Sequence, residues 1–247
     1  MRFVAISDTH LATPSLPEGD VLLHAGDLTF QGNLPEVSRA AAWLEEQKRL
    51  KGFKHVVVVA GNHDWLFQRD PGLARQIMQE RGLLYLEDSG LTLEGDEALP
   101  GIQPGGGRIT IYGSPWQPRF YDWAFNLPRG GPLAEKWNAI PAGIDILLTH
   151  GPAHGILDGA PAFDEDAYPS DDSITKRHVG CEELRKAVRR IKPKVHVFGH
   201  IHSNPGRVEK DGTLFINAAI MNESYTPRWA PHVFELLPNK EVRPKCD

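Results

Sequence analysis

The sequence predicts an α/β domain, and three observations lead to that expectation. Short apolar runs rich in Val and Ile recur along the 247 residues, and several are continuous, which is typical of strands covered on both faces. Stretches with apolar residues at helical spacing separate these runs, and alternating strands and helices favour an α/β fold. Polar signatures directly follow several of the runs, and the carboxyl ends of strands form the usual ligand crevice of such a sheet.

The expected strands are short and contain many β-branched residues, which favours strands over helices. They are residues 3–6, 21–23, 56–60, 109–112, 144–148, 195–198 and 233–237. Between residues 83 and 113 the chain reads as short strands with turns, because Gly101 and the run 104–107 break any longer element. We therefore expect a sheet that is mixed or doubled.

Three helices are expected between the strands. The first covers residues 35–51, with apolar residues at helical spacing. The second covers 71–81, because proline suits the first turn of a helix and Gly82 suits its end. The third covers 181–191 and ends before Pro193.

Two long irregular insertions are expected, at residues 114–132 and 151–179. Structureless loops of that length inside a compact domain are usually functional or disordered, and the sequence does not reveal whether these two close over a substrate. No linker-like change of composition divides the chain. We therefore expect one domain over residues 1–240, followed by a C-terminal tail at 241–247.

Composition narrows the possible partners. The net charge of −5 argues against a long nucleic-acid partner, although bound metals would still attract a small phosphorylated substrate. The two cysteines, Cys181 and Cys246, provide no disulfide framework, so we expect a reducing, cytoplasmic setting. We find no secretory signal and no apolar window long enough to span a membrane, and therefore expect no membrane partner. The oligomeric state is not indicated.

Five polar signatures occur in order along the chain, each at the end of an expected strand. They are Asp8-Thr9-His10, Gly26-Asp27, Gly61-Asn62-His63-Asp64, Thr149-His150-Gly151 and Gly199-His200-Ile201-His202. Carboxylates, an amide and imidazoles together suit a pair of borderline divalent metals. Such a pair is a device for in-line attack on a phosphoester. The alternative is that these are polar loop residues present by chance. It would need a separate explanation for the polar residues at each strand end.

Individual residues suggest individual roles. The Asp27 carboxylate could bridge two cations, and the Asn62 amide could offer oxygen to a metal and NH2 to a phosphate. We expect His63 to donate a proton to the leaving oxygen, with Asp64 orienting its ring. The alternatives are that His63 only binds phosphate and that Asp64 only caps a turn.

The ordered series resembles the calcineurin-like metallophosphoesterase superfamily. Residues 113–118, 126–130 and 192–202 are similar to its MPPED-type (metallophosphoesterase-domain-containing) branch. The resemblance implies a four-layer α-β-β-α sandwich with two central mixed β-sheets. It also implies two divalent metal ions; Mn²⁺ is our first expectation, and Fe or Zn would also suit the mixed nitrogen and oxygen ligands.

The resemblance assigns ligands to each metal. The first ion would be held by Asp8, His10, Asp27 and His202. The second would be held by Asp27, Asn62, His150 and His200. His63 would assist the leaving group or bind phosphate.

The expected function is a dinuclear metal-dependent phosphodiesterase acting on small phosphodiesters. The branch is associated with such hydrolysis, including that of cyclic nucleotides, and attack by a metal-bridging hydroxide is the expected reaction. One alternative is a phosphomonoesterase or protein phosphatase using the same site. Others are a nucleotide-binding module with little turnover and a DNA nuclease, which the acidic balance disfavours.

Five residues are candidates for substrate contacts: Asn62, His63, Trp116, Arg129 and His154. Trp116 begins an aromatic cluster at 116–125 that could stack a nucleotide base or simply anchor a loop. Arg129 could reach phosphate, and His154 follows His150 by four positions.

Other charged and imidazole groups have simpler interpretations. We expect His24 to be a buried, hydrogen-bonded residue at the floor of the site and His196 to be a packed core residue. The basic stretch of residues 186–194 is typical of a solvated helix face rather than of a nucleic-acid patch.

Overall fold

The computed structural model describes residues 1–94, 107–161 and 176–245. The predicted turns at Gly101 and 104–106 lie outside these residues, as does Cys246.

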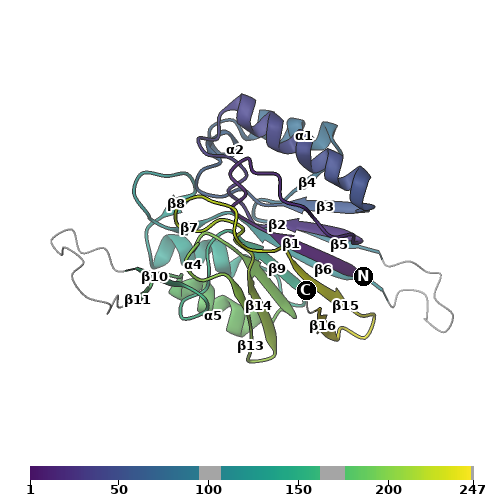
Figure 1. Cartoon of the computed structure of the whole chain (residues 1–247). Helices are drawn as coiled ribbons and strands as arrows, with labels where there is room; N and C mark the ends of the chain where they lie inside the picture. The colour runs from purple at the N-terminus through teal and green to yellow at the C-terminus, as the bar shows by residue number, and fades with distance from the viewer. Residues whose placement is uncertain (95–106, 162–175, 246–247) are drawn as a thin grey trace.

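Within the described residues, two six-stranded mixed sheets pack face to face with helices on both outer faces, so the predicted four-layer fold is confirmed (Figure 1). The first sheet has the order β16-β15-β1-β2-β3-β4. Its strands are β1 (Arg2–Ile6), β2 (Val21–His24), β3 (His55–Val58), β4 (Leu84–Tyr85), β15 (His232–Leu236) and β16 (Val242–Pro244). Strands β1 to β4 run parallel, whereas β15 and β16 are antiparallel to their neighbours.

The second sheet has the order β13-β14-β12-β9-β6-β5. Its strands are β5 (Ser89–Leu93), β6 (Ile109–Ser114), β9 (Ile146–Thr149), β12 (Val195–Phe198), β13 (Gly206–Lys210) and β14 (Thr213–Asn217). The four inner strands are parallel, and the edge strands β5 and β13 are antiparallel.

Five helices occur in the described residues: α1 (Leu34–Lys51), α2 (Trp65–Arg69), α3 (Pro71–Glu80), α4 (Gly131–Asn138) and α5 (Glu182–Ile191). In Figure 1, α1 lies on one outer face and α4 and α5 lie on the other. Local chemistry fixes their starts: Asn33 caps α1 by accepting from the Glu36 N–H at 3.0 Å, and α3 begins at Pro71 behind the Asp70 cap.

Three apolar clusters correspond to the three interfaces between the four layers. The outer faces of the first and second sheets pack against helices through clusters that include Val37 and Leu44 of α1 and Leu184 and Val188 of α5. The inner cluster joins the two sheets through residues such as Phe234. Burial on both faces explains why the parallel strands read as continuous apolar runs.

Three sequence expectations need correction. The predicted tail at 241–247 is part of the fold where the structure describes it, because β16 pairs with β15. The insertion at 114–132 contains the short parallel pair β7 (Gln117–Pro118) and β8 (Asn126–Leu127), and α4 begins at its end. The described parts of the insertion at 151–179 include the antiparallel pair β10 (Gly159–Pro161) and β11 (Lys176–His178).

None of the helices in the described ranges has both the length and the apolar character needed to cross a bilayer.

Candidate metal centre

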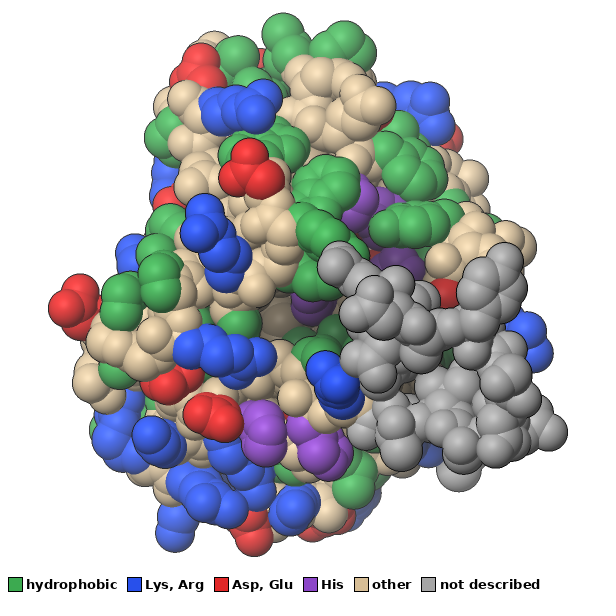
Figure 2. Space-filling view, turned by 90° about the vertical axis from the view of Figure 1, so that its left-hand side faces the viewer, with side chains coloured by type: hydrophobic (Ala, Val, Ile, Leu, Met, Phe, Trp, Pro, Cys, Tyr) green, Lys and Arg blue, Asp and Glu red, His purple; other side chains and the backbone are tan. Residues whose placement is uncertain are grey.

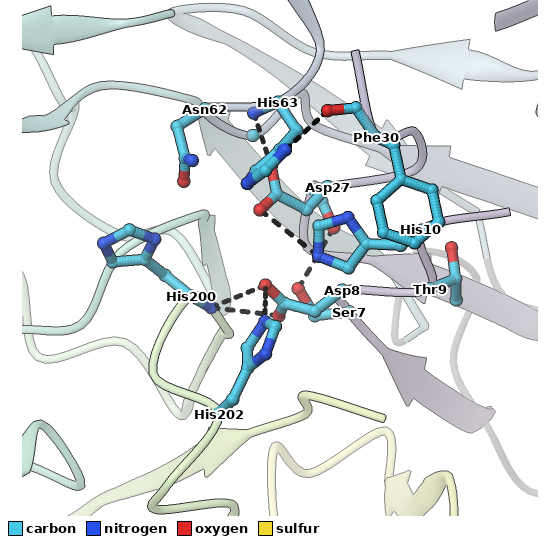
Figure 3. A network of polar contacts seen from close by, with 12 residues as sticks. Ser7, Asp8, Thr9, His10, Asp27, Phe30, Asn62, His63, His200 and His202 are labelled. Carbon is cyan, nitrogen blue, oxygen red and sulfur yellow. Dashed lines mark hydrogen bonds and ion pairs between the residues drawn. The ribbon is translucent and has the colours of Figure 1, made fainter. Parts of the chain in front are cut away.

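The polar signatures meet where the parallel strands of both sheets end. Asp8 and Asp27 follow β1 and β2 of the first sheet, whereas His150 and His200 follow β9 and β12 of the second. Figure 3 shows Asp8, Asp27, His10, His63 and His202 around one space, with Asn62 and His200 at its side. Side chains separated by most of the chain are therefore neighbours, as the strand-end pattern predicted.

Several of these residues have an unusual backbone conformation. The φ angles of Asp8, His10, Asp27 and His200 are +53°, +42°, +55° and +69°. Non-glycine residues rarely adopt positive φ, because each such residue costs of order 1–3 kcal/mol and persists only where the surrounding structure imposes it. The fold thus holds the backbone of these four residues in a strained form, which is typical of functional sites.

Two glycines allow the backbone to approach the carboxylates. A Cβ atom on Gly199 would overlap the Asp8 carboxylate and the side chain of Ser7, and one on Gly61 would overlap Asp27. These glycines are therefore part of the geometry that places Asp8 and Asp27.

Backbone carbonyls orient three of the imidazoles. The Nδ1 atoms of His10, His150 and His202 lie 2.8, 2.9 and 3.0 Å from the carbonyl oxygens of Thr29, Ala25 and Asn222. A carbonyl oxygen can only accept, so each Nδ1 carries the proton and donates it. In the neutral rings the Nε2 lone pair is left for another partner, which is the arrangement of metal-ligating histidines.

The donor atoms form three overlapping groups whose members lie within 4.8 Å of one another. They are Asp8 with His10 and His202, His10 with Asp27 and His63, and Asp27 with His150 and His200. Oδ2 of Asp27 lies 3.7 Å from Nε2 of His10 and 3.5 Å from Nε2 of His150, so Asp27 belongs to two groups. The arrangement places Asp27 centrally, where a bridging ligand must lie.

One buried nitrogen that could bind a metal has no hydrogen-bond partner among the described residues. Nε2 of His10 is buried, and no atom of the described residues satisfies it. A buried polar atom without a partner is costly, and a metal ion would satisfy this one. The oxygen and nitrogen donors, their spacing and this atom together fit divalent cations such as Mn²⁺, Fe²⁺ or Zn²⁺.

The buried carboxylates strongly favour their charged forms. Burial alone would raise the pKa of Asp8, but its hydrogen bond to His202 at 3.1 Å and the charges of His202 and His150 hold the pKa well below its usual range. Oδ2 of Asp8 also accepts the backbone N–H of His200 at 2.9 Å. Burial likewise opposes ionisation of Asp27, yet the charge of His150 and its hydrogen bond outweigh it and lower that pKa.

The imidazoles divide according to whether the attraction of a carboxylate outweighs the effect of burial on the pKa. Burial would lower the pKa of His150, but the charge of Asp27 and its hydrogen bond raise it to about 9. By contrast, burial lowers the pKa of His200 and of His24 to about 3. His24 is fully buried and lies 2.9 Å from the Thr9 hydroxyl, as expected for the site floor. The centre of the site thus stabilises positive charge beside Asp27.

His63 lies beside the ligand cluster, but Asp64 does not orient it. Nδ1 of His63 donates to the carbonyl of Phe30 at 2.6 Å (Figure 3). The Asp64 carboxylate instead accepts from the backbone N–H groups of Leu28, Thr29 and Gly61 and from the Thr29 hydroxyl. The predicted role of Asp64 is therefore wrong, and its carboxylate ties two strand-end loops together. Burial and the nearby Asp27 charge raise its pKa to about 6.

A cavity of about 440 Å³ opens onto these residues. Asp27, Asn62, His63, His200 and His202 contribute to its lining, together with Arg119, Phe120, Arg129 and Tyr225. In Figure 2, histidine side chains lie at the base of a hollow with hydrophobic side chains around it. The volume is that of a small-molecule site.

Two predicted substrate residues do not line this cavity. The Trp116 indole donates to Asp88 at 2.9 Å and packs edge-on against Phe125, so it anchors the loop in the core. His154 packs beside the ring of His178, with the centroids 5.5 Å apart. Neither residue is among the described residues that line the cavity, so the contacts found for them do not support a role in substrate binding.

Arg129 does line the cavity, but its guanidinium is already engaged. Its Nη1 and Nη2 atoms donate to the carbonyls of Gly180 and Val179 at 2.8 and 2.7 Å. Arg129 therefore holds the end of the insertion at 151–179 in place. Its two Nη atoms are not free to bind a phosphate group together.

Aromatic residues that sequence reasoning missed surround the histidines. The Tyr225 ring lies 4.9 Å from the ring of His10 and 5.3 Å from that of His202. Trp123 packs 4.1 Å from His63, and Phe30 packs 5.0 Å from His10. No local signal marked Phe30 or Tyr225, because their contacts depend on how distant loops fold back. Trp123 belongs to the aromatic cluster at 116–125, but no sequence pattern indicated that it lies beside His63.

Comparison with known proteins agrees with this geometry. A family model described as calcineurin-like phosphoesterase matches residues 1–204. The chain is 38% identical to human metallophosphoesterase domain-containing protein 1 over 260 residues, which cover 95% of this chain and 71% of the human protein. It is 34% identical to a UPF0046 protein of Caenorhabditis elegans over 267 residues, which cover 96% of this chain and 60% of that protein.

Among solved structures, the chain is similar to a cold-active protein-tyrosine phosphatase of a psychrophilic Shewanella species. That match covers 98% of this chain and 80% of the phosphatase, with 11% identity and a TM-score of 0.35. A likeness this low bears on neither fold nor substrate.

Proposed function

Since this chain belongs to the calcineurin-like phosphoesterase family, we propose that it is a dinuclear metal-dependent phosphodiesterase acting on small phosphodiesters, cyclic nucleotides among them. The observation that carries the proposal is the complete donor set around Asp27 beside a cavity of about 440 Å³. When bound, a metal pair would supply a nucleophile from water and neutralise charge on the phosphate oxygens.

The chain's own residues supply the remaining chemistry. Asp27 lies between the donor groups, and Asn62 lies with its Oδ1 atom 2.9 Å from Nε2 of His150. The Phe30 carbonyl holds the proton on Nδ1 of His63, so a second proton on this ring resides on Nε2. In that form His63 would donate the Nε2 proton to the departing alkoxide. Tyr225 and Trp123 shield the rings of His10 and His63 from water.

The charges of the cavity favour diesters over monoesters. Sites for monoester dianions usually contain arginine side chains that bind the phosphate through two N–H groups. A diester carries one negative charge fewer and needs less positive charge from the protein. Of the two arginines among the described lining residues, Arg129 is engaged by backbone carbonyls, which leaves Arg119. Glu223 also lines the cavity and repels additional negative charge. The Phe120 and Tyr225 rings would suit the flat base of a nucleotide.

The experiment is a substrate panel with purified protein reconstituted separately with Mn²⁺, Fe²⁺ and Zn²⁺. Bis-p-nitrophenyl phosphate, p-nitrophenyl phosphate, and 2′,3′- and 3′,5′-cyclic nucleotides are ranked by kcat/KM. We expect the diesters to rank above the monoester, with Mn²⁺ supporting the highest activity. A monoester preference would assign a phosphomonoesterase or protein phosphatase to the same site. Tight nucleotide binding without product would assign a binding module.

Compartment and partners follow from the same proposal. Two cysteines among 247 residues support a reducing, cytoplasmic setting, and Cys181 is buried and free. The acidic net charge supports a small substrate over a long nucleic acid.

A further inference from the structure

A second cavity lies between α5 and the β13–β14 hairpin, away from the metal centre. Its volume is about 380 Å³. Thr213 and Phe215, at the start and middle of β14, contribute to its lining, whereas the metal ligands follow the carboxyl ends of the parallel strands. The two cavities have no described lining residue in common.

The described residues that line this second cavity are strongly basic. Arg185 and Arg189 come from α5, Lys192 caps that helix, and Lys210 comes from β13. Asp211 is the one acidic residue among them. A protein with a net charge of −5 thus concentrates positive charge around one cavity.

Arg185 is the buried member of this set. The residue is only 7% exposed, its guanidinium lies 5.7 Å from the centre of the Phe215 ring, and its Nη2 atom donates to Asp211 at 3.0 Å. Its Nη1 atom is buried and has no hydrogen-bond partner in the described part of the chain. An unsatisfied charged donor is costly, and an anionic oxygen would supply the missing acceptor.

The other three cations are not neutralised by neighbours. Among the described residues, no ion pair or hydrogen bond involves the side chain of Arg189, Lys192 or Lys210. Basic residues in the last turn of a helix stabilise its dipole, which accounts for Arg189 and Lys192. This explanation does not extend to Lys210, which comes from a strand, or to the unsatisfied atom of Arg185.

We propose that this cavity binds a small phosphate-bearing anion with at least two negative charges, such as a diphosphate group. Four cations offset by one carboxylate match such a charge, and a cavity of about 380 Å³ has room for a small ligand. The turn between β13 and β14 is a tight two-residue hairpin turn, in which Asp211 and Gly212 both have positive φ. This turn places Lys210 and Asp211 at the cavity wall.

The test uses the Zn²⁺-loaded protein of 247 residues and inorganic pyrophosphate as the probe. Binding is measured by calorimetry in the wild type, in an R189Q/K210Q variant, and in a K186Q/K194Q control. The control removes the same charge from exposed residues outside the cavity. Pyrophosphate that binds at the metal centre contributes equally to all three proteins, because both variants leave the metal ligands intact.

We expect one set of sites to weaken at least about tenfold in R189Q/K210Q and to stay unchanged in the control. Hydrogen exchange should show pyrophosphate protecting residues 185–192 and 207–215 in the wild type. Identical isotherms in all three proteins, or equal weakening in both variants, would overturn the proposal. A single-stranded ten-nucleotide DNA that binds more tightly than pyrophosphate and depends on Arg189 and Lys210 would replace it with a nucleic-acid site. None of these outcomes depends on phosphodiesterase activity.

Discussion

Nδ1 of His63 lies 2.6 Å from the carbonyl oxygen of Phe30, so a backbone group rather than a carboxylate fixes the orientation of this ring. A neutral acceptor orients the imidazole without adding negative charge beside it. The proton on Nδ1 stays in this hydrogen bond, so Nε2 is the ring nitrogen that is available to the substrate. Backbone carbonyls orient His10, His150 and His202 in the same way. The role of His63 as a proton donor to the substrate is therefore our proposal, which its substitution tests.

The first prediction concerns His63. We expect His63→Ala to lower kcat about 10²–10⁴-fold while metal content is retained, because loss of general acid catalysis typically has this cost. Metal content is measured by elemental analysis, and kcat with a cyclic nucleotide, whose departing alkoxide needs a proton. A substrate with a better leaving group needs less protonation and should narrow the gap. Loss of metal in this variant would instead make His63 a ligand.

The second prediction concerns Asp27. Asp27→Asn should lose both metals and all activity, since this carboxylate belongs to two of the donor groups. Asp88→Asn is the matched control, because Asp88 binds Ser114, Trp116 and Lys136 away from the metal centre. The control should keep its metals even if it melts at a lower temperature. An Asp27→Asn protein that retains both ions would refute the bridging role.

The third prediction concerns metal removal. Chelation should abolish activity and lower Tm, and added Mn²⁺ should restore both, because the folded site binds cations better than the unfolded chain does. A free metal concentration 100-fold above Kd corresponds to about 2.7 kcal/mol of stabilisation. Differential scanning calorimetry across a metal titration measures the effect. A Tm independent of metal concentration would contradict a site preformed in the folded state.

The fourth prediction concerns Gly199. Gly199→Ala should reduce stability by about 1–3 kcal/mol and weaken metal binding, because its Cβ atom would overlap the Asp8 carboxylate and Ser7. The matched control is Gly131→Ala, where an added Cβ would meet nothing within 4 Å. Chemical denaturation and metal titration of both variants separate general destabilisation from displacement of Asp8. Equal metal affinity in the two variants would contradict the prediction.

The fifth prediction concerns acid stability and His196. Burial, with the charge of Arg185, lowers the pKa of this fully buried ring to about 3. The Thr149 hydroxyl donates to the Gly151 carbonyl at 2.7 Å and therefore accepts from Nε2 of His196 at 2.9 Å. Nδ1 is then an acceptor without a hydrogen-bond partner among the described residues. The folded protein thus keeps this ring neutral.

Between the ordinary pKa of 6.5 and the folded pKa of about 3, the unfolded chain binds a proton that the folded chain does not. The free energy of unfolding therefore falls as pH is lowered through this window, by up to about 1.4 kcal/mol per pH unit for one group. His196→Gln should flatten this slope. The same change at half-buried His55 is the control and should have less effect. Urea unfolding from pH 7 to pH 4 measures both slopes.

Much of the fold and most of the candidate ligands could be predicted, for a physical reason. Parallel strands buried on both faces leave continuous apolar runs, and polar residues directly after such runs must lie at one sheet edge. Asp8, Asp27 and His200 were located in this way. Strand β13 escaped notice because it is an exposed edge strand of mostly polar residues and leaves no apolar run. Strand β14 is buried and has a short apolar run at residues 214–216, which was overlooked.

The errors came from contacts that no local pattern encodes. Asp64 neighbours His63 in sequence, but its carboxylate turns toward the loop after β2, where Leu28 and Thr29 offer N–H groups. Trp116 has the chemistry of a base-stacking residue, but its indole N–H donates a hydrogen bond to Asp88. Both outcomes depend on partners at least 28 positions away in the sequence.

The distribution of the ligands over the two sheets has a consequence for biosynthesis. Asp8 and His202 contact each other across 194 positions, so the first donor leaves the ribosome long before the last. The amino-terminal strands on their own present only Asp8, His10, Asp27 and Asn62. A nascent chain therefore cannot assemble the full set of donor groups until synthesis has passed His202.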